Sequence, residues 1–295
     1  APAVQFNLTP ILCDCNLDDL SVDIYHLDKL FKNEKPSALI LVSVLGLVPN
    51  MDAIVSLCQE HDVLLIEDIC ESLYSKYKGQ LLGTFGKVAI NSLYFGHHTS
   101  TVEGGIITTN DKLLYDTMVM CRSHGWARGL DEEKKKELQT EWDVSDFESW
   151  YKFYEPGFNL RATDWQAFIG LRQLQKLDSF VEARNRIYNL YQSLIVNDYW
   201  KPTEYADRFV SLLGYPVISP CREKIVQDLI ANGVECRPLI AGSMGNQPFF
   251  IKRYGRVSLS LGDIVDKYGL YVPCHPFLKD EDVQLIALII NKHTT

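Results

Sequence analysis

The sequence predicts an α/β protein whose large domain contains a mostly parallel sheet and is followed by a smaller α+β domain. Two nearly continuous apolar runs, residues 38–45 and 63–66, are typical of strands that are buried on both faces of a parallel sheet. A helical pattern at residues 50–61 lies between them, so the three segments form a βαβ unit with parallel strands. After residue 200 the strands and helices become shorter, which indicates a second unit.

The other elements of the first part follow in order along the chain. Asn50 is expected to cap the first helix, and the second strand ends at Asp68. Strand patterns return at residues 88–95 and 105–109, and Asn110 is expected to cap the next helix.

Two further segments complete the first part of the chain. Residues 126–155 contain a highly charged run and are expected to form a solvated loop. Thr163 and Gln166 make a capping-box pair, which predicts a long amphipathic helix over residues 163–195.

We place a domain boundary at the end of this helix. Residues 1–195, including the connecting helix, form the large domain, and residues 196–295 form the small domain. In the small domain, strand and helix patterns alternate at residues 208–218, 221–231, 233–237 and 280–292.

Composition excludes several classes of protein. The 295 residues are 46% apolar and 23% charged, values that fit an ordinary folded protein and not a disordered, collagen-like or coiled-coil chain. The net charge of −9 argues against a nucleic-acid partner. The longest apolar stretch, residues 38–48, is too short to span a membrane, and the first ten residues do not resemble a signal peptide. We therefore expect a cytoplasmic protein.

The eight cysteines are too sparse for a disulfide scaffold, and none forms a Cys-x-x-Cys motif. Cys13 and Cys15 would share one face of a strand, which is only a weak metal-binding pattern. We expect reduced thiols and no metal site.

Two carboxylates follow the second predicted strand. In an open α/β sheet, ligands bind beyond the carboxyl ends of the strands, where Asp68 stands. Asp68 could pair with a cationic ring nitrogen or a metal, or it could simply cap a turn. Glu71 would face the same cleft if a helical turn begins there, and otherwise it would be a solvated carboxylate.

Two adjacent histidines follow the next strand pattern. His97 and His98 lie in a polar loop between Ser92 and the sequence Glu-Gly-Gly that begins at Glu103. The ordinary pKa of imidazole suits proton transfer near neutral pH, although a histidine is often structural. A zinc site would need further ligands that we cannot place.

Several motifs in the same order resemble the DegT/DnrJ/StrS family of pyridoxal-phosphate enzymes of nucleotide-sugar metabolism. Ordered agreement across several motifs is more specific than any one of them. The resemblance covers nearly the whole chain and implies the type I aminotransferase fold. The motifs lie at residues 65–72, 77–86, 92–95, 103–111, 122–125 and 157–167.

The resemblance also implies roles for individual residues. Asp68 would pair with the pyridinium nitrogen of pyridoxal 5'-phosphate, with Glu71 facing the same cofactor cleft. Ser92 would contact the cofactor phosphate, and Asn159 would reach the phosphate bound by a neighbouring subunit, which implies a homodimer. Arg161 would bind the carboxylate of an amino-acid cosubstrate, unless it is only a surface residue at the start of a helix.

The chain departs from the family's aminotransferases at one position. These enzymes place a lysine six residues before the glutamate of Glu-Gly-Gly, where this chain has His97. Imidazole cannot form the usual Schiff base, so the cofactor would be held without a covalent bond and His97 would act as a general base. The His-His pair and residues 233–248 resemble a branch of the family, the 4-keto-6-deoxysugar 3-dehydratases.

By this resemblance, the predicted reaction is the 3-dehydration of a nucleotide-linked 4-keto-6-deoxy sugar. An amino acid, expected to be glutamate, would first convert the cofactor to its pyridoxamine form. His97, beside His98, would then move a proton while the C3 hydroxyl leaves. Two alternatives stay open: a sugar aminotransferase whose lysine has been replaced, and a catalytically silent binding or regulatory relative.

The family's chains also carry several dozen residues before the segment that matches residues 4–15. That part includes a phosphate-binding turn at a helix N-terminus, which this sequence does not contain. We therefore expect the chain to be an N-terminally truncated member of the family, with an incomplete large domain.

Overall fold

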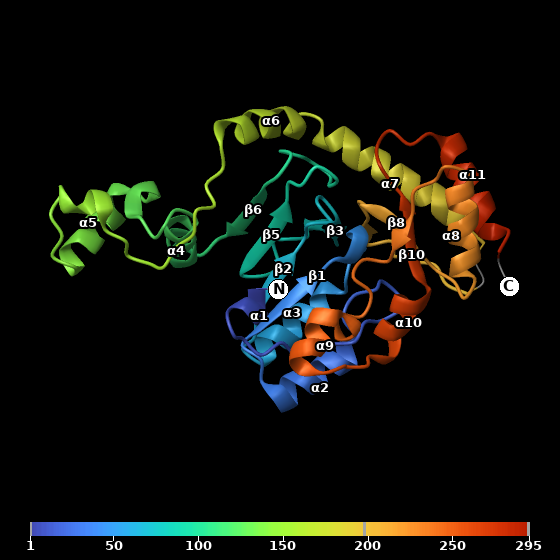
Figure 1. Ribbon diagram of the computed structural model, residues 1–295, viewed down its shortest axis with the longest axis horizontal. Coiled ribbons are helices and arrows are strands. Elements are labelled where there is room, and N and C mark those ends of the chain that lie inside the picture. The colour runs from blue at the N-terminus through green and yellow to red at the C-terminus, as the bar shows by residue number, and fades with distance from the viewer. Residues whose placement is uncertain (1, 197–198, 294–295) are drawn as a thin grey trace.

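The computed structural model describes residues 2–196 and 199–293 (Figure 1). A four-stranded sheet with the order β1-β2-β5-β6 forms the first part of the molecule. Strands β1, β2 and β5 are parallel, and β6 is antiparallel to β5, which confirms the predicted mixed and mostly parallel sheet. The strands are β1 (Ala38–Val42), β2 (Leu64–Asp68), β5 (Val88–Ser92) and β6 (Gly105–Thr109).

Side-chain caps set the starts of the helices in this part. Asn50 accepts a hydrogen bond from the amide of Ala53 at 3.3 Å, which confirms it as the cap of α3 (Met51–Glu60). The prediction that Asn110 caps the next helix is wrong by one residue. The side chain of Asp111 accepts from the amide of Leu114 at 3.0 Å, so α4 spans Lys112–Arg122.

The first strand is shorter and less buried than predicted. It ends at Val42 and is followed by a 3-10 turn, η1 (Val44–Gly46). Ile40 and Val42 are 52% and 42% exposed, so the strand is not buried on both faces. Gly46 has φ +102°, and a Cβ atom there would lie 2.2 Å from the carbonyl oxygen of Ser211, so this turn requires glycine.

The charged stretch after α4 forms a helix where we expected a loop. Helix α5 (Glu132–Glu141) is capped by Asp131 and carries ion pairs one turn apart, such as Lys134 with Glu137 at 2.8 Å. Such pairs support a helix that buries little apolar surface. Together, α4 and α5 form an arm that projects from the sheet in Figure 1.

The predicted long helix is two helices, α6 (Asp164–Leu174) and α7 (Leu177–Leu194), with a break at Gln175 and Lys176. The capping box of Thr163 and Gln166 is confirmed at the start of α6.

The last part of the chain surrounds a three-stranded antiparallel sheet with the order β8-β10-β9. Helices α8 (Arg222–Ala231) and α11 (Asp280–Asn291) match the predicted ones. The predicted strand at 208–218 is split, because β7 (Arg208–Phe209) pairs with the hairpin of β3 (Lys76–Tyr77) and β4 (Gln80–Leu81). The sheet strands are β8 (Gly214–Ile218), β9 (Arg237–Pro238) and β10 (Gly269–Pro273).

Sequence patterns did not reveal the hairpin of β3 and β4, and the predicted strand at 233–237 is reduced to β9. They also did not reveal α1 (Pro2–Gln5), α2 (Ile24–Glu34), α9 (Pro248–Tyr254), α10 (Ser260–Tyr268) and β10. No helix of the described residues is long and apolar enough to cross a membrane.

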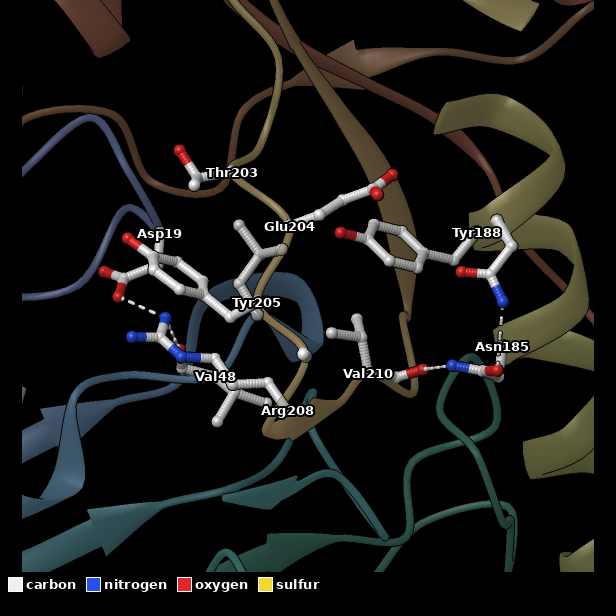
Figure 2. Close-up of a pocket in the computed structure, with 12 residues that line it drawn as sticks. Asp19, Val48, Asn185, Tyr188, Thr203, Glu204, Tyr205, Arg208 and Val210 are labelled. Atoms are coloured by element: carbon white, nitrogen blue, oxygen red, sulfur yellow. Dashed lines mark hydrogen bonds and ion pairs between the residues drawn. The ribbon is translucent and has the colours of Figure 1, made fainter. Parts of the chain in front are cut away.

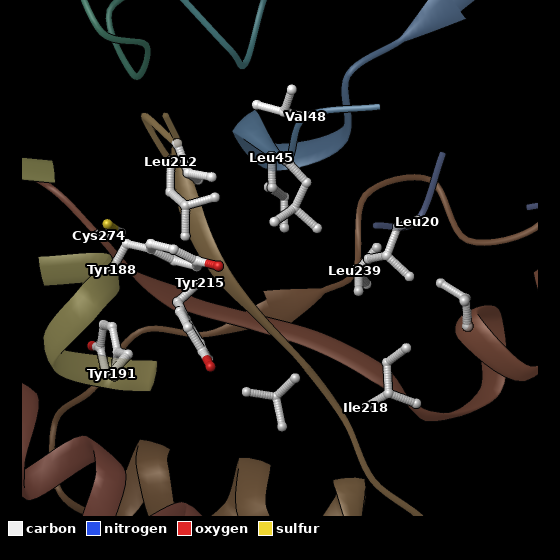
Figure 3. Packing of buried hydrophobic residues seen from close by; sticks show 14 of the residues in the cluster. Leu20, Leu45, Val48, Tyr188, Tyr191, Leu212, Tyr215, Ile218, Leu239 and Cys274 are labelled. Carbon is white, nitrogen blue, oxygen red and sulfur yellow. The ribbon is translucent and has the colours of Figure 1, made fainter. Parts of the chain in front are cut away.

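One hydrophobic cluster joins the two parts of the chain. Figure 3 shows Leu45 of η1 close to Leu212 and Tyr215, and Tyr191 of α7 packs on Tyr215 with ring centroids 4.7 Å apart. The first residues also reach the last part, since the carboxylate of Asp14 accepts from two amides at the start of α10. The domain boundary at residue 195 therefore stays a prediction.

Glu67, the residue before Asp68, is buried with 2% exposure. Its carboxylate accepts hydrogen bonds from the amides of Gly83, Phe85 and Gly86 at 2.6, 2.8 and 2.6 Å. These charge-assisted bonds hold the loop before β5 against the end of β2.

We expect Glu67→Gln to lower the free energy of unfolding by about 2 to 4 kcal/mol, because the amide group turns a donor toward buried N–H donors. Urea unfolding measures the change, and exposed Glu133→Gln on α5 is the control. Equal stability of the two variants would contradict this account of the loop.

Candidate active site

Two carboxylates meet at the carboxyl end of β2. Asp68 Oδ1 accepts a hydrogen bond from the amide of Cys70 at 3.1 Å. Glu71 Oε2 accepts from the amide of Leu45 at 2.7 Å, which links this turn to η1 at the end of the neighbouring strand β1. Residues 69–71 form a non-helical turn, and the prediction that Glu71 faces the same cleft as Asp68 stays a prediction.

The side chain of Glu71 is largely buried, which changes the pKa of its carboxyl group. Burial raises the pKa of Glu71 from 4.5 to about 7, the hydrogen bond from Leu45 opposes the rise, and the negative charge of Asp68 adds to it. The Glu71 carboxyl group therefore binds its proton more tightly than an exposed glutamate does.

His97 reaches this turn from the loop after β5. Its Nδ1 atom lies 2.5 Å from the carbonyl oxygen of Cys70, and its ring packs edge-on against Tyr94 with centroids 5.9 Å apart. A carbonyl oxygen only accepts hydrogen bonds, so Nδ1 carries a proton, and in the neutral ring the lone pair is on Nε2. The half-buried ring therefore presents Nε2 as a possible proton acceptor beside the carboxylate turn.

His98, which we predicted as a second catalytic residue, points into the interior. It is 3% exposed, and its Nε2 lies 3.0 Å from the carbonyl oxygen of Ser211. Burial, together with the charge of Arg184, lowers the pKa of His98 to about 3. A ring that is enclosed and stays neutral is poorly placed to exchange protons with a substrate, and the predicted catalytic role of His98 stays a prediction.

Ser92 is the last residue of β5, next to Gly105 in the register of β6. Its hydroxyl oxygen accepts a hydrogen bond from the amide of Tyr94 at 3.2 Å. Because β5 is parallel to β2, Ser92 and Asp68 lie at the same edge of the sheet. The hydroxyl proton of Ser92 can still be donated to an anion.

Asn159 and Arg161 lie elsewhere, on the exposed segment between the arm and α6. Asn159 forms a β-bridge with Ser123, and Arg161 donates to the Asn159 side chain at 3.1 Å. The single chain does not bring either residue to Asp68. Their predicted roles toward a second subunit and a cosubstrate stay predictions.

The site also contains groups that residue types could not reveal. The amide of Leu45 and the carbonyl of Cys70 are main-chain groups, so the identity of these residues gives no sign of their role in the site.

A cavity of about 340 Å³ lies elsewhere in the molecule (Figure 2). It is lined by Asp19, Tyr188, Glu204 and Arg208 among others, and by none of the predicted site residues.

Residues 1–291 match the DegT/DnrJ/EryC1/StrS aminotransferase family. The chain belongs to this family. It is 31% identical over 301 residues to the GDP-4-keto-6-deoxy-D-mannose 3-dehydratase of Yersinia pseudotuberculosis, covering 99% of this chain and 75% of that protein. It is also 28% identical over 298 residues to the GDP-perosamine synthase of Caulobacter vibrioides, covering 96% of this chain and 73% of that protein.

Comparison with solved structures points to the same family. The Escherichia coli GDP-4-keto-6-deoxy-D-mannose-3-dehydratase with bound hydrated PLP has a TM-score of 0.87 and 27% identity, covering 98% of this chain and 76% of that one. A GDP-4-keto-6-deoxymannose-3-dehydratase with a trapped PLP-glutamate geminal diamine has a TM-score of 0.88 and 26% identity, with the same coverage. These relatives confirm the predicted family, fold, enzyme class and cofactor.

The raised pKa of Glu71 predicts a pH-dependent stability. The folded protein binds this proton more tightly than the unfolded chain, so the contribution of Glu71 to stability is lost as the pH rises from about 4.5 to about 7. At roughly 1.4 kcal/mol per pKa unit, the loss is at most about 3 kcal/mol.

Glu71→Gln keeps an acceptor for the amide of Leu45 but cannot ionise. We expect the free energy of unfolding of the wild type to decrease by about 1 to 3 kcal/mol between pH 5 and pH 8. The decrease should be smaller in this variant. Exposed Glu34→Gln is the control. An unchanged pH profile in Glu71→Gln would show that Glu71 titrates normally.

Proposed function

We propose that this chain is a pyridoxal-phosphate-dependent 3-dehydratase of a nucleotide-linked 4-keto-6-deoxy sugar, with glutamate as the amino-acid cosubstrate. The observation that carries the proposal is His97, which stands where the aminotransferases have lysine and is hydrogen-bonded to the turn that contains Asp68 and Glu71. GDP-4-keto-6-deoxymannose is the first substrate to test, because two relatives are named for it.

The residues at this edge of the sheet fit the cofactor. Asp68, which accepts from the amide of Cys70, carries the carboxylate that would pair with a pyridinium nitrogen, while the hydroxyl of Ser92 suits a phosphate. When bound, pyridoxal phosphate supplies an electron sink for breaking bonds next to its amine.

A covalent link through lysine has no support here. Lys87 and Lys112, the lysines nearest to His97 in the sequence, lie at the opposite end of β5 and β6 from Ser92. Their ammonium groups pair with Asp111 and Asp116, respectively, each at 2.5 Å. The cofactor would therefore be held by hydrogen bonds and charge alone.

His97 would move the proton. With Nδ1–H donated to Cys70, Nε2 is the atom that takes a proton from the bound substrate–cofactor pair and returns it to the departing C3 hydroxyl. The carbonyl of Cys70 stabilises the charged ring once Nε2 is protonated, because its bond from Nδ1–H then becomes charge-assisted.

A homodimer is part of the proposal. Helix α6 exposes an apolar stripe, with Trp165, Phe168, Leu171 and Leu174 between 56% and 77% exposed. Such a stripe is typical of a subunit interface. The side chain of Gln166 on the same helix donates to the carbonyl of Glu103 at 2.7 Å, which places the stripe beside the His97 loop. A second copy that covers α6 would bring Asn159 and Arg161 toward the neighbouring site.

The reaction can be tested directly. With pyridoxal phosphate, glutamate and GDP-4-keto-6-deoxymannose, we expect release of 2-oxoglutarate and a 3-deoxy sugar product. His97→Asn should lower the rate by about 100-fold or more, the usual contribution of a general base, while the cofactor absorbance shows that binding is retained. An amino sugar made by the wild type would instead support the alternative of an aminotransferase.

The interface is tested separately. Leu171→Glu places a charge in the stripe of α6, so we expect a monomer by light scattering, whereas Leu288→Glu on α11, where the leucine is 67% exposed, should remain a dimer. A dimeric Leu171→Glu would contradict this choice of interface.

A further inference from the structure

Residues 210–213, which we call the strap, lead into β8 and are held by side chains from other parts of the chain. The carbonyl of Ser211 is bonded by His98 at 3.0 Å. The carbonyls of Leu212 and Leu213 accept from Arg184 on α7 at 2.8 and 3.2 Å. The carbonyl of Val210 accepts from Asn185 at 2.9 Å, as Figure 2 shows.

The strap also contacts the carboxylate turn of the candidate site. The amide of Leu213 donates to the carbonyl of Leu45 at 2.8 Å, and the amide of Leu45 donates to Glu71. The hydroxyl of Ser75 accepts from the amide of Ser211 and donates to the carbonyl of Gly46, each at 3.0 Å. The close approach at Gly46 leaves no room for a larger residue. The strap and the turn are therefore joined by one connected set of hydrogen bonds.

His98 is the link from this set to the proton-transfer residue. The carbonyl of Ser211 accepts only, so Nε2 of His98 is protonated, and among the described residues Nδ1 has no hydrogen-bond partner. The ring is enclosed, so it cannot rearrange without breaking the bond to Ser211. It holds the backbone next to His97 at a fixed distance from the strap.

We propose that His98 is a positioning residue for His97. By tying the His97 loop to the strap, which also holds the Glu71 turn, His98 keeps the His97 ring aligned so that Nδ1 meets the carbonyl of Cys70 and Nε2 faces the cofactor site. The proposal rests on the role given to His97 in the proposed function. Misplacing a reacting group by about 1 Å can cost about 100-fold in rate.

Four variants separate positioning from general stability. His98→Leu fills the space without a donor, and His98→Asn carries an amide too short to reach Ser211. His98→Gln supplies an N–H donor at a similar reach and is the rescue variant. Asn185→Leu removes a different bond to the strap, the one to Val210, and is the matched control.

Two readouts are needed. In the cofactor-free protein, nitrogen-15 NMR of the imidazole groups reports whether His97 Nδ1 keeps its protected proton. In the loaded enzyme, kcat and KM are measured with the nucleotide sugar. We expect His98→Leu and His98→Asn to lose the His97 signal and to lower kcat by about 10- to 100-fold, with KM within about twofold. His98→Gln should restore both, and Asn185→Leu should leave both unchanged.

The proposal is overturned if His98→Leu, or His98→Asn where the leucine variant does not fold, retains the His97 signal and kcat. It is also overturned if Asn185→Leu lowers kcat as much as the His98 variants do, since the strap would then act only through stability. If the wild type makes no 3-deoxy sugar, the proposed function fails, while the NMR comparison still decides whether His98 holds His97.

Discussion

The site depends on the hydrogen bond between His97 Nδ1 and the carbonyl oxygen of Cys70. Parallel strands bring the ends of β2 and β5 to one edge of the sheet, but they do not fix where the loop after β5 goes. This bond joins that loop to the turn that carries Asp68 and Glu71. It also fixes the tautomer of the ring, so one contact determines both the place and the chemical character of His97.

The polar side chains around the site form hydrogen bonds mainly with buried main-chain amides and carbonyls. Glu67 accepts three amides, Glu71 accepts one, and Arg184 donates to carbonyls. Among the described residues, no carboxylate lies within ion-pair distance of Arg184, and one of its terminal nitrogens donates to the strap carbonyls of Leu212 and Leu213 and to the carbonyl of Cys274. Buried polar groups of this kind are costly when unpaired, which makes each main-chain partner part of the stability of the site.

The sequence was sufficient for the parts that depend on side-chain pattern. Apolar runs predicted β1 and β2, and the caps of α3 and α6 followed from Asn50 and from the Thr163–Gln166 pair. Helix α5 was missed because its stability depends on ion pairs between turns, and a charged run without an apolar face is equally typical of a loop.

The candidate site, like the fold, could be predicted from the sequence only in part. Asp68, Glu71, Ser92 and His97 stood out in the sequence because of their residue types, their places at strand ends and the family resemblance, and the structure brings them to one edge. The different surroundings of His97 and His98 could not be foreseen, because adjacent histidines cannot be told apart by residue type. Two rings on consecutive residues of a loop can point in opposite directions, and here one meets Cys70 and the other meets Ser211, which is 113 residues away from it in the chain.

This long-range contact links the last part of the chain to the loop that carries His97. The strap leads into β8, and Leu212 of the strap and Tyr215 of β8 both belong to the common core. The His97 loop is therefore tied to a segment that lies far from the strand ends in sequence. The boundary predicted at residue 195 separates this loop from the strap, and the hydrogen bond of His98 to Ser211 links the two parts although their sheets are distinct.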